Sequence, residues 1–493
     1  MTTVFVTGAT GFVGRALCPD LLRRGYRVRA WVRDPEAAKT LVGPQVELVD
    51  AAGGDQALHE AVSDADIVIG LAGAPVAGRR WTKAWKKQMR ESRVGLTERV
   101  SKAIQTVGKE AGPKVFLSAS GVGYYGDAGA SELDERSSRG RGYLSQLSAD
   151  WEAAAMQAES ENVRVAVLRL GVVLGRGGGA LATMKPVFAM GLGGRLGNGR
   201  QHMPWIHVHD VVEAIHHIAH CRSIEGPVNL VANEQHTNAS FVATLGEAMR
   251  RPTLLPVPAF ALRLLFGEGA QVVLTGQRVT PAVLQKTGFE YRFPTLAGAL
   301  AEVFQTQSIS IQRLPNRELN HLPSDFGYFQ KRRPTYLLTC ETTLGKPIEE
   351  VFPFFAEPGN LSVLTPPDMS FRIVQAPSEV GQGTLIEYVI RLGLLPMRWT
   401  TRIEKWDEGS LFVDSQVRGP YQTWWHEHYL RSARDGAATV MEDRVYYTPP
   451  LGLLGRLVHR FMISSELRRI FGYRGSMVQL RFGVDAPFEQ AAE

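Results

Sequence analysis

The segment VFVTGATGFVG, residues 4–14, constrains the fold of this chain more than any other stretch. It starts with a short apolar run, typical of a buried parallel strand, and leads into a predicted helix. Gly8 permits a tight turn, Gly11 lets the backbone approach a pyrophosphate, and Gly14 lets helix and strand pack closely. The helix would direct its free N–H groups and its positive dipole end at that anion. The residues predicted to contact a dinucleotide here are Thr7, Gly8, Thr10, Gly11, Phe12, Val13 and Gly14.

The second predicted strand, residues 26–32, ends at Arg33. In a dinucleotide-binding fold the end of this strand faces the adenosine ribose, where an acidic residue suits a free 2′-OH and an arginine suits a 2′-phosphate. Arg33 therefore predicts NADP (NADPH) as the cofactor. Because Asp34 follows directly, a solvated arginine at a strand end is the alternative interpretation.

Further buried strands follow at residues 46–49, 65–74 and 114–120, with a long charged helix predicted over 80–105. This alternation of strands and helices predicts an α/β fold of the Rossmann type, with a doubly wound parallel sheet. Strand ends in such a sheet face the cofactor. The residues predicted to contact it there are Leu71, Ala72, Gly73 and Ser118.

Composition limits what the rest of the chain can be. With 493 residues, 44% of them hydrophobic, the chain should fold into two or three domains. A net charge of +6 without a long basic run does not indicate a nucleic-acid partner. The three scattered cysteines favour a reducing cytoplasm, and no apolar run reaches the roughly 20 residues of a membrane span.

Six ordered motifs carry a family resemblance. They are TGATGFVG (7–14), LAGAP (71–75), SASGVGYYGD (118–127), DWEAAA (150–155), LRLGVVLGRGGGAL (168–181) and PWIHVHD (204–210). Residues 1–305 resemble an atypical extended short-chain dehydrogenase/reductase of the nucleoside-diphosphate-sugar epimerase subgroup. Residues from about 250 to 305 resemble the small C-terminal module of that subgroup, some members of which carry a cell-division-inhibitor label.

The resemblance implies a serine near the nicotinamide, and a tyrosine followed four residues later by a lysine. A nearby ammonium group is needed because it lowers the tyrosine pKa from about 10, so that the phenol can act as a base. Ser120 matches the serine, but Tyr143 is followed by Leu147.

A second register, set by Glu152, places the pair on Leu144 and Ser148, and this register also lacks the lysine. The Tyr-x-x-x-Lys pair is therefore absent. Tyr124, Tyr125 or Tyr143 would have to move the proton beside Ser120, and packing without chemistry is the alternative role for the tyrosines.

Two glycine-rich segments, residues 175–179 and 191–200, are predicted to be flexible loops facing the substrate. Their arginines, Arg176, Arg195 and Arg200, could clasp a diphosphate or a carboxylate, or could be solvated loop charges. A strand predicted over 205–209 places His207 and His209 on one face, and we expect His207 to contact substrate. The simplest role for Asp210 is the N-cap of the helix that follows.

Residues 306–330 are predicted to be a linker, and residues 331–485 begin a new pattern of one strand, two helices, several strands and a long helix over 453–482. This order resembles the START-like SRPBCC superfamily, particularly its polyketide cyclase/dehydrase-like branch. The resemblance implies an α+β helix-grip domain with a cavity for an apolar or aromatic ligand. The matching local segments are 351–352, 364–367, 419–421, 425–428 and 443–447.

His426 and His428 share one face of a predicted strand with Trp424. Alternation along the strand places one of its two faces against the cavity, but does not decide which. Since spacing fixes no third ligand, the sequence predicts no metal site.

These observations favour an NADP-binding epimerase or oxidoreductase that acts on a sugar nucleotide or a related carbonyl or alcohol substrate. The absent lysine keeps open a second hypothesis, a redox-inactive NADP-binding regulatory or scaffold protein. The sequence names neither the substrate nor the oligomeric state.

Overall fold

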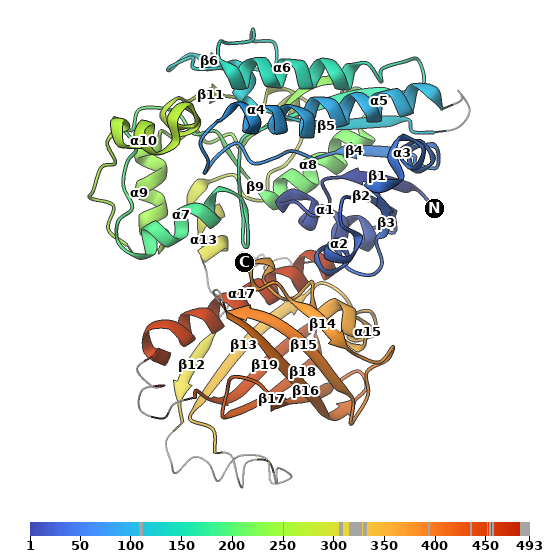
Figure 1. The fold of residues 1–493 in the computed structure, drawn as a ribbon, viewed down its shortest axis with the longest axis vertical. Helices are drawn as coiled ribbons and strands as arrows, with labels where there is room; N and C mark the ends of the chain where they lie inside the picture. The colour runs from blue at the N-terminus through green and yellow to red at the C-terminus, as the bar shows by residue number, and fades with distance from the viewer. Residues whose placement is uncertain are drawn as a thin grey trace, which may run out of the picture. The chain divides into compact units, whose positions relative to one another are not determined.

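The computed structural model describes residues 1–107, 112–249, 251–304, 309–314, 328, 333–392, 395–433, 436–450, 452, 455 and 458–483. The chain divides into two compact units, Met1–Gln305 and Thr306–Glu493 (Figure 1). Each unit has its own sheet and its own buried apolar clusters.

A seven-stranded sheet in the order β10-β7-β5-β4-β1-β2-β3 forms the centre of the N-terminal unit, and all its pairings are parallel. The strand order reverses direction at β1, so the predicted doubly wound Rossmann-type sheet is confirmed. Its strands are β1 Thr3–Thr7, β2 Arg27–Val32, β3 Glu47–Asp50, β4 Ile67–Gly70, β5 Val115–Gly121, β7 Arg164–Leu170 and β10 Gly226–Leu230.

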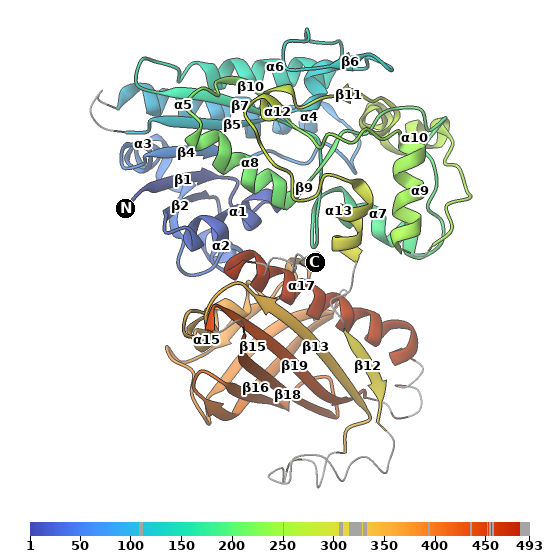
Figure 2. The ribbon, with the colours of Figure 1, turned by 180° about the vertical axis from the view of Figure 1, so that it is seen from behind.

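Helices cover both faces of this sheet (Figures 1 and 2). On one face α3, α5 and α6 pack through an apolar cluster that includes Phe5, Val62 and Val100. On the other face α1 packs against α8. The helices up to α8 are α1 Phe12–Arg23, α2 Pro35–Val42, α3 Gly54–Ser63, α4 Lys83–Arg90, α5 Leu96–Thr106, α6 Tyr143–Met156, α7 Gly179–Ala189 and α8 Val208–His220.

The long helix predicted over 80–105 is confirmed as a continuous helical run from Lys83 to Thr106, in which a π-helical turn, Glu91–Gly95, lies between α4 and α5. Short 3₁₀ turns lie at Ala51–Gly53, Val122–Tyr125 and Gly267–Ala270. The rest of the unit contains two small parallel pairs and five helices in its described part. These are β6 Glu132–Leu133 with β11 Arg278–Val279, β8 Val172–Leu174 with β9 Trp205–His207, α9 Asn238–Met249, α10 Ala259–Phe266, α11 Gln271–Leu274, α12 Ala282–Lys286 and α13 Leu296–Phe304.

The strand predicted over 205–209 stops at His207, which is itself the N-cap of α8. The predictions for the next residues are therefore wrong: His209 lies in the helix, and Asp210 is not the N-cap. The carboxylate of Asp210 instead accepts hydrogen bonds from the backbone N–H groups of Arg292 and Phe293, at 2.8 and 3.1 Å. Asp210 thus holds a loop that is distant in the sequence, and the residues around Asp210 do not indicate this contact.

The C-terminal unit is built on an eight-stranded sheet in the order β12-β13-β19-β18-β17-β16-β15-β14. All its pairings are antiparallel. The strands are β12 Ser310–Arg313, β13 Tyr336–Leu344, β14 Arg372–Gln375, β15 Leu385–Leu392, β16 Leu395–Asp407, β17 Leu411–Arg418, β18 Thr423–Ala433 and β19 Ala438–Thr448. The helices with given bounds in its described part are α15 Ile348–Ala356 and α17 Ser464–Phe482, with short helical turns at Pro358–Leu361, Pro367–Met369 and His459–Ile463.

One boundary differs from the sequence prediction. Strand β12 lies inside the predicted linker 306–330 and pairs with β13, so the linker assignment is wrong for residues 310–313. Residues 315–327 and 329–330 of that linker lie outside the described residues. The helix predicted over 453–482 is helical at every described residue, with the π-helical turn His459–Ile463 leading directly into α17; residues 453, 454, 456 and 457 lie outside the described part.

Helix α17 decides which face of β18 is internal. Phe471 of α17 belongs to the same apolar cluster as Trp424, and its ring centroid lies 5.4 Å from that of His426. Trp425, on the opposite face, packs with Tyr446 in a separate cluster. The face that carries Trp424, His426 and His428 is therefore covered by α17.

No helix in the described ranges is long and apolar enough to cross a membrane. The cysteines Cys18, Cys221 and Cys340 are free thiols.

Candidate functional site

The turn after β1 has the backbone geometry that the sequence predicts. Gly8 has φ +77°, and a Cβ there would lie 2.6 Å from the backbone nitrogen of Ala72. A Cβ on Gly14 would lie 2.3 Å from the carbonyl oxygen of Gly8. Both positions therefore need glycine for close approach, and the turn sits against the segment that follows β4.

Gly11 differs from these two glycines. It is the N-cap of α1, with φ −72°, and within the described structure a Cβ there would contact only the carbonyl oxygen of Gly8, at 3.1 Å. No side chain in the described part of the chain caps α1. The first-turn N–H groups thus have the arrangement that binds an anion at a helix N-terminus.

The glycine-rich loop 175–179, predicted to be flexible, is packed against the start of α1. A Cβ on Gly178 would lie 2.3 Å from the Phe12 ring, and one on Gly179 would lie 2.8 Å from it. Arg15 donates a hydrogen bond to the carbonyl oxygen of Gly177 at 3.2 Å. Glycine at these positions therefore permits close packing around Phe12.

Arg15 is a residue that the sequence interpretation missed. Its Nε and Nη1 atoms are buried and have no hydrogen-bond partner among the described residues. They lie on the first turns of α1, beside the glycine turn. The only signal in the sequence for donors at this position is that Arg15 directly follows Gly14.

At the end of β2, Arg33 is exposed and Asp34 is the N-cap of α2. The Asp34 carboxylate accepts a hydrogen bond from the Ala37 N–H at 3.0 Å. The Asp34 carboxylate is thus used to cap α2, which leaves Arg33 as the exposed charged side chain at the end of β2.

Arg93, in the π-helical turn, is a second residue that the sequence interpretation missed. A Cβ on Gly73 would lie 3.0 Å from its guanidinium carbon, so Arg93 covers the segment that follows β4. Burial lowers the pKa of Arg93 to about 10. No carboxylate within the described ranges pairs with it, so this cation can receive an anionic group from a ligand.

Ser120 lies at the end of β5 in a buried network. Its Oγ donates a hydrogen bond to Glu152 Oε1 at 2.7 Å. Arg169, directly opposite Ser120 on β7, donates to both Glu152 oxygens at 2.8 and 2.7 Å. Burial lowers the pKa of Arg169, but the hydrogen bonds and charge of Glu152 outweigh burial and raise it. Ser118 is fully buried, two residues before Ser120.

The tyrosines predicted to move a proton have different surroundings. Tyr125 is 2% exposed; it donates to Asn229 Oδ1 at 2.7 Å and accepts from Arg169 at 2.9 Å. Burial raises the pKa of Tyr125 to about 12, which opposes a role as a base near neutral pH. Tyr143 donates to the carbonyl oxygen of Lys86 at 2.9 Å, and burial raises its pKa also.

Tyr124 lies next to this network. Its ring sits under the Arg169 guanidinium, 3.6 Å from ring centroid to guanidinium carbon. Its hydroxyl makes no hydrogen bond within the described part of the chain. Of the three tyrosines, Tyr124 alone combines an uncommitted hydroxyl with a nearby cation.

The residues predicted to bind substrate do not form one cluster. Arg176 pairs with Glu302 at 3.2 Å, and His207 Nε2 lies 3.2 Å from the other oxygen of that carboxylate. Burial raises the pKa of Glu302, but the hydrogen bond with His207 and the charge of Arg176 outweigh it and lower the pKa. These two side chains connect α13 to the loop after β8 and to the end of β9 within the N-terminal unit, a contact that no local motif indicates.

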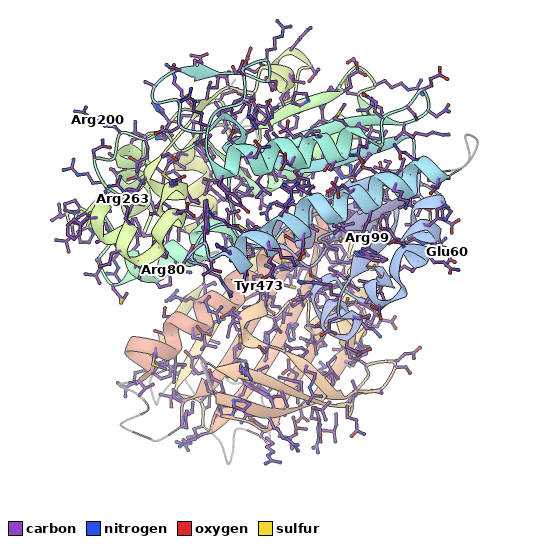
Figure 3. The ribbon with its side chains drawn as sticks, turned by 45° about the horizontal axis from the view of Figure 1, so that its top comes forward. Glu60, Arg80, Arg99, Arg200, Arg263 and Tyr473 are labelled. Carbon is purple, nitrogen blue, oxygen red and sulfur yellow. The ribbon has the colours of Figure 1, made fainter. Side chains whose placement is uncertain are left out.

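Arg195 and Arg200 are exposed, and Arg200 lies at the periphery of the unit (Figure 3). Their loop is fastened as well, because the Arg195 carbonyl accepts from the Val257 N–H at 2.8 Å and the Gly197 N–H donates to the Val257 carbonyl at 2.9 Å. The loop 191–200 therefore pairs with the segment around Val257, a contact that the sequence interpretation did not anticipate.

The parallel sheet and the glycine turn at its strand ends define a Rossmann-type protein. Residues 4–230 match the NAD dependent epimerase/dehydratase family, and residues 257–303 match a domain of unknown function, DUF1731. The chain belongs to the NAD dependent epimerase/dehydratase family.

The epimerase family protein SDR39U1 homolog, chloroplastic, of Arabidopsis thaliana is 39% identical over 307 residues, which are 62% of this chain and 87% of the relative. Human epimerase family protein SDR39U1 is 36% identical over 61% of this chain and 99% of the relative. The match to residues 257–303 falls in the region predicted to be a subgroup-specific module.

Among solved structures, human SDR39U1 (isoform 2) with NADPH is similar at TM-score 0.56 and 35% identity, covering 62% of this chain and 99% of that chain. A UDP-N-acetylglucosamine 4-epimerase from Methanobrevibacter ruminantium M1 shares the fold, at TM-score 0.51 and 17% identity over 62% of this chain and 97% of that chain. Neither family match extends beyond residue 303.

Proposed function

We propose that the N-terminal unit binds NADP(H) and catalyses hydride transfer to or from a carbonyl or alcohol carbon, as an epimerase or reductase of a sugar nucleotide or a related substrate. The observation that carries this proposal is Ser120, held at the carboxyl end of β5 by the buried Glu152–Arg169 pair. Ligands of parallel α/β sheets bind at this edge.

The side chains around the glycine turn support NADP(H) as the cofactor. Arg33 is exposed at the end of β2, and Arg15 has two unused donors beside α1. Human SDR39U1, which is similar over the same part of the chain, was solved with NADPH.

We expect Arg33→Ala to weaken NADPH binding about 10-fold to 100-fold and to leave NADH binding nearly unchanged, because a charge-assisted hydrogen bond contributes about 1.5–3 kcal/mol. Calorimetric titration of both cofactors into wild type and variant measures this. Arg27→Ala is the matched control, since Arg27 lies at the other end of the same strand and pairs with Glu47. Equal wild-type affinities for NADPH and NADH would contradict the assignment.

A proton route without a lysine follows from the hydrogen bonds of Ser120. The cofactor, when bound, supplies the hydride acceptor or donor. As a substrate alcohol is oxidised, its O–H proton passes to Ser120 Oγ while the Ser120 proton passes to Glu152, so that the charges balance. Tyr124 is the second candidate for this transfer, because its hydroxyl is uncommitted beside Arg169.

Arg93 supports a substrate that carries an anion, such as the diphosphate of a sugar nucleotide. It places a cation without a carboxylate partner in the described structure beside Gly73, in the segment expected to line the cofactor. An arginine so placed favours phosphate or carboxylate groups.

The second candidate function is a redox-inactive NADP-binding regulatory or scaffold protein. The observation that favours it is the commitment of the Tyr125 and Tyr143 hydroxyls to Asn229 and to the Lys86 backbone. Together with the missing lysine, this leaves only Ser120 and Tyr124 for proton transfer.

Absorbance of NADPH, followed with a panel of sugar nucleotides and carbonyl compounds, separates the two functions. We expect turnover with at least one substrate, and we expect Ser120→Ala to lower its rate by about 100-fold or more. Ser101→Ala is the matched control, because this buried serine donates to the Ala154 carbonyl on the other side of α6. Tight NADPH binding without turnover of any substrate would favour the regulatory function.

For the C-terminal unit we propose a START-like, SRPBCC-type helix-grip domain, over residues 331–485, that binds an apolar or aromatic molecule. The support is α17 lying against one face of an antiparallel sheet, with aromatic rings between them; Trp424 lies 5.3 Å from Trp399 and 4.7 Å from Tyr421, between ring centroids. Saturable binding of an apolar fluorescent probe to the full chain is the expected result. Binding that does not saturate would contradict this assignment.

A further inference from the structure

Two histidines and two aspartates converge on the face of the C-terminal sheet that α17 covers. Asp414 of β17 lies opposite His426 of β18, and His428 lies opposite Asp443 of β19. His426, His428 and Asp443 are each 5% exposed or less, and Asp414 is partly buried. Three adjacent strands thus bring two imidazoles and two carboxylates together within an apolar core.

Asp414 faces one nitrogen of each imidazole. Its Oδ2 lies 3.0 Å from His428 Nε2 and 3.5 Å from His426 Nδ1. Ligands bound at about 2.0–2.1 Å to a tetrahedral metal lie about 3.3 Å from one another. The spacing of these atoms therefore fits a single ion, and this is the one group of at least three such ligands found in the described structure, with its atoms within 4.8 Å.

The other nitrogen of each ring faces Asp443. Its Oδ1 lies 2.8 Å from His428 Nδ1 and 3.1 Å from His426 Nε2. An ionised carboxylate only accepts hydrogen bonds, so each ring can donate an N–H to it when its proton lies on that side. This leaves a lone pair on His428 Nε2 and on His426 Nδ1, both directed toward Asp414; a carboxylate that orients ligating histidines in this way is a common second partner at metal sites.

With a neutral His428 and no metal ion, the cluster has a mismatch. If His428 carries its proton on Nδ1, the 3.0 Å contact with Asp414 joins two acceptors. If the proton is on Nε2, the 2.8 Å contact with Asp443 joins two acceptors instead. Arg474 adds a cation on the other side of the ring: its Nη2 lies 3.0 Å from Nδ1 and 3.5 Å from Asp443 Oδ1, and it donates to Nδ1 when the imidazole proton is on Nε2.

We propose that Asp414, His426 and His428 bind one divalent first-row transition-metal ion of the zinc or iron(II) class, with Asp443 as the positioning residue. Two imidazole nitrogens and one carboxylate oxygen are typical ligands of such ions. Three protein ligands leave a coordination position for water or for a small ligand. Phe412 stacks on His428 at 3.9 Å between centroids and excludes water on that side of the ring.

The test uses the full chain, stripped with a chelator and titrated with Co²⁺. We expect one Co²⁺ per chain, the visible d–d absorption of a four-coordinate site with nitrogen and oxygen ligands, and displacement by Zn²⁺. Asp414→Asn and His428→Gln should each weaken binding by about 100-fold or more. His459→Gln is the matched control, since this buried histidine of the same unit binds the Tyr447 hydroxyl at 2.7 Å and lies outside the cluster.

A second measurement on the unmutated chain does not depend on how the variants fold. Zn²⁺ should shift the imidazole ¹⁵N resonances of two histidines and leave those of His459 in place. Stoichiometric binding with these shifts supports the site. Absence of a Co²⁺ spectrum, absence of the ¹⁵N shifts, or equal affinity in folded Asp414→Asn and His428→Gln would each overturn it. Iron(II) and Zn²⁺ titrations compared in parallel identify which ion binds more tightly.

Discussion

Replacing Gly11 by valine is expected to abolish NADPH binding while the N-terminal unit stays folded. A Cβ at this position would meet only the Gly8 carbonyl oxygen, at 3.1 Å, among the described residues. The branched side chain would therefore extend into the space where the proposed pyrophosphate approaches α1, rather than into the core. Calorimetric titration should show an affinity at least about 100-fold lower, equivalent to about 2.7 kcal/mol or more.

Gly95→Val is the matched control for this experiment. Gly95 is the last residue of the π-helical turn before α5, its backbone is helical, and a Cβ there would meet nothing within 4 Å in the described structure. This variant should bind NADPH as the wild type does. If folded Gly11→Val also binds NADPH normally, the pyrophosphate does not lie at the start of α1.

Local patterns in the sequence predicted the turn and the sheet for a physical reason. The strand–turn–helix at residues 4–14 is encoded by contiguous residues, and its glycines are required by backbone contacts within a few positions or with the adjacent strand end. Buried parallel strands read as apolar runs, so the order of elements in the N-terminal unit followed directly.

Contacts between distant segments were not predictable in the same way. Glu302 pairs with Arg176 and His207, which lie 126 and 95 residues away in the sequence. Without that contact, the sequence suggested that both side chains were free to bind substrate. Arg93 was hidden inside a helix that the sequence presents as continuous, because nothing local indicates the π-helical turn.

The C-terminal cluster shows the same limit. The alternation of β18 placed His426 and His428 on one face, but Asp414 reaches them only through the register of β17 against β18. Strand register depends on turn geometry and on which face of the strand is buried. The local sequence of β17 and β18 does not show which face α17 covers, so it does not fix the register.

Two acidic residues of α6, Glu152 and Asp150, can each be replaced by alanine. Glu152→Ala is expected to cause the larger loss of stability. The side chain of Arg169 is 3% exposed and that of Glu152 is 12% exposed, so Glu152→Ala leaves an uncompensated buried charge. Losing one partner of such a pair costs about 3–5 kcal/mol. Asp150→Ala, two residues earlier, breaks a pair with Arg90 whose side chains are 26% and 53% exposed, and should cost less than about 1 kcal/mol.

Hydrogen exchange measured by mass spectrometry on peptides from β5 and β7 resolves this local stability without requiring two-state unfolding of a two-unit chain. The double variant Glu152→Leu/Arg169→Met removes the ion pair without leaving a buried charge. It therefore separates the effect of losing the pair from the effect of burying an unpaired guanidinium. Because it removes both charges and fills the space with apolar atoms, it should be more stable than Glu152→Ala alone. It should also lack turnover, since Ser120 would then have no carboxylate to receive its proton. A Glu152→Ala variant as stable as Asp150→Ala would mean that the guanidinium of Arg169 finds water or another acceptor, and that the network around Ser120 is less rigid than its geometry indicates.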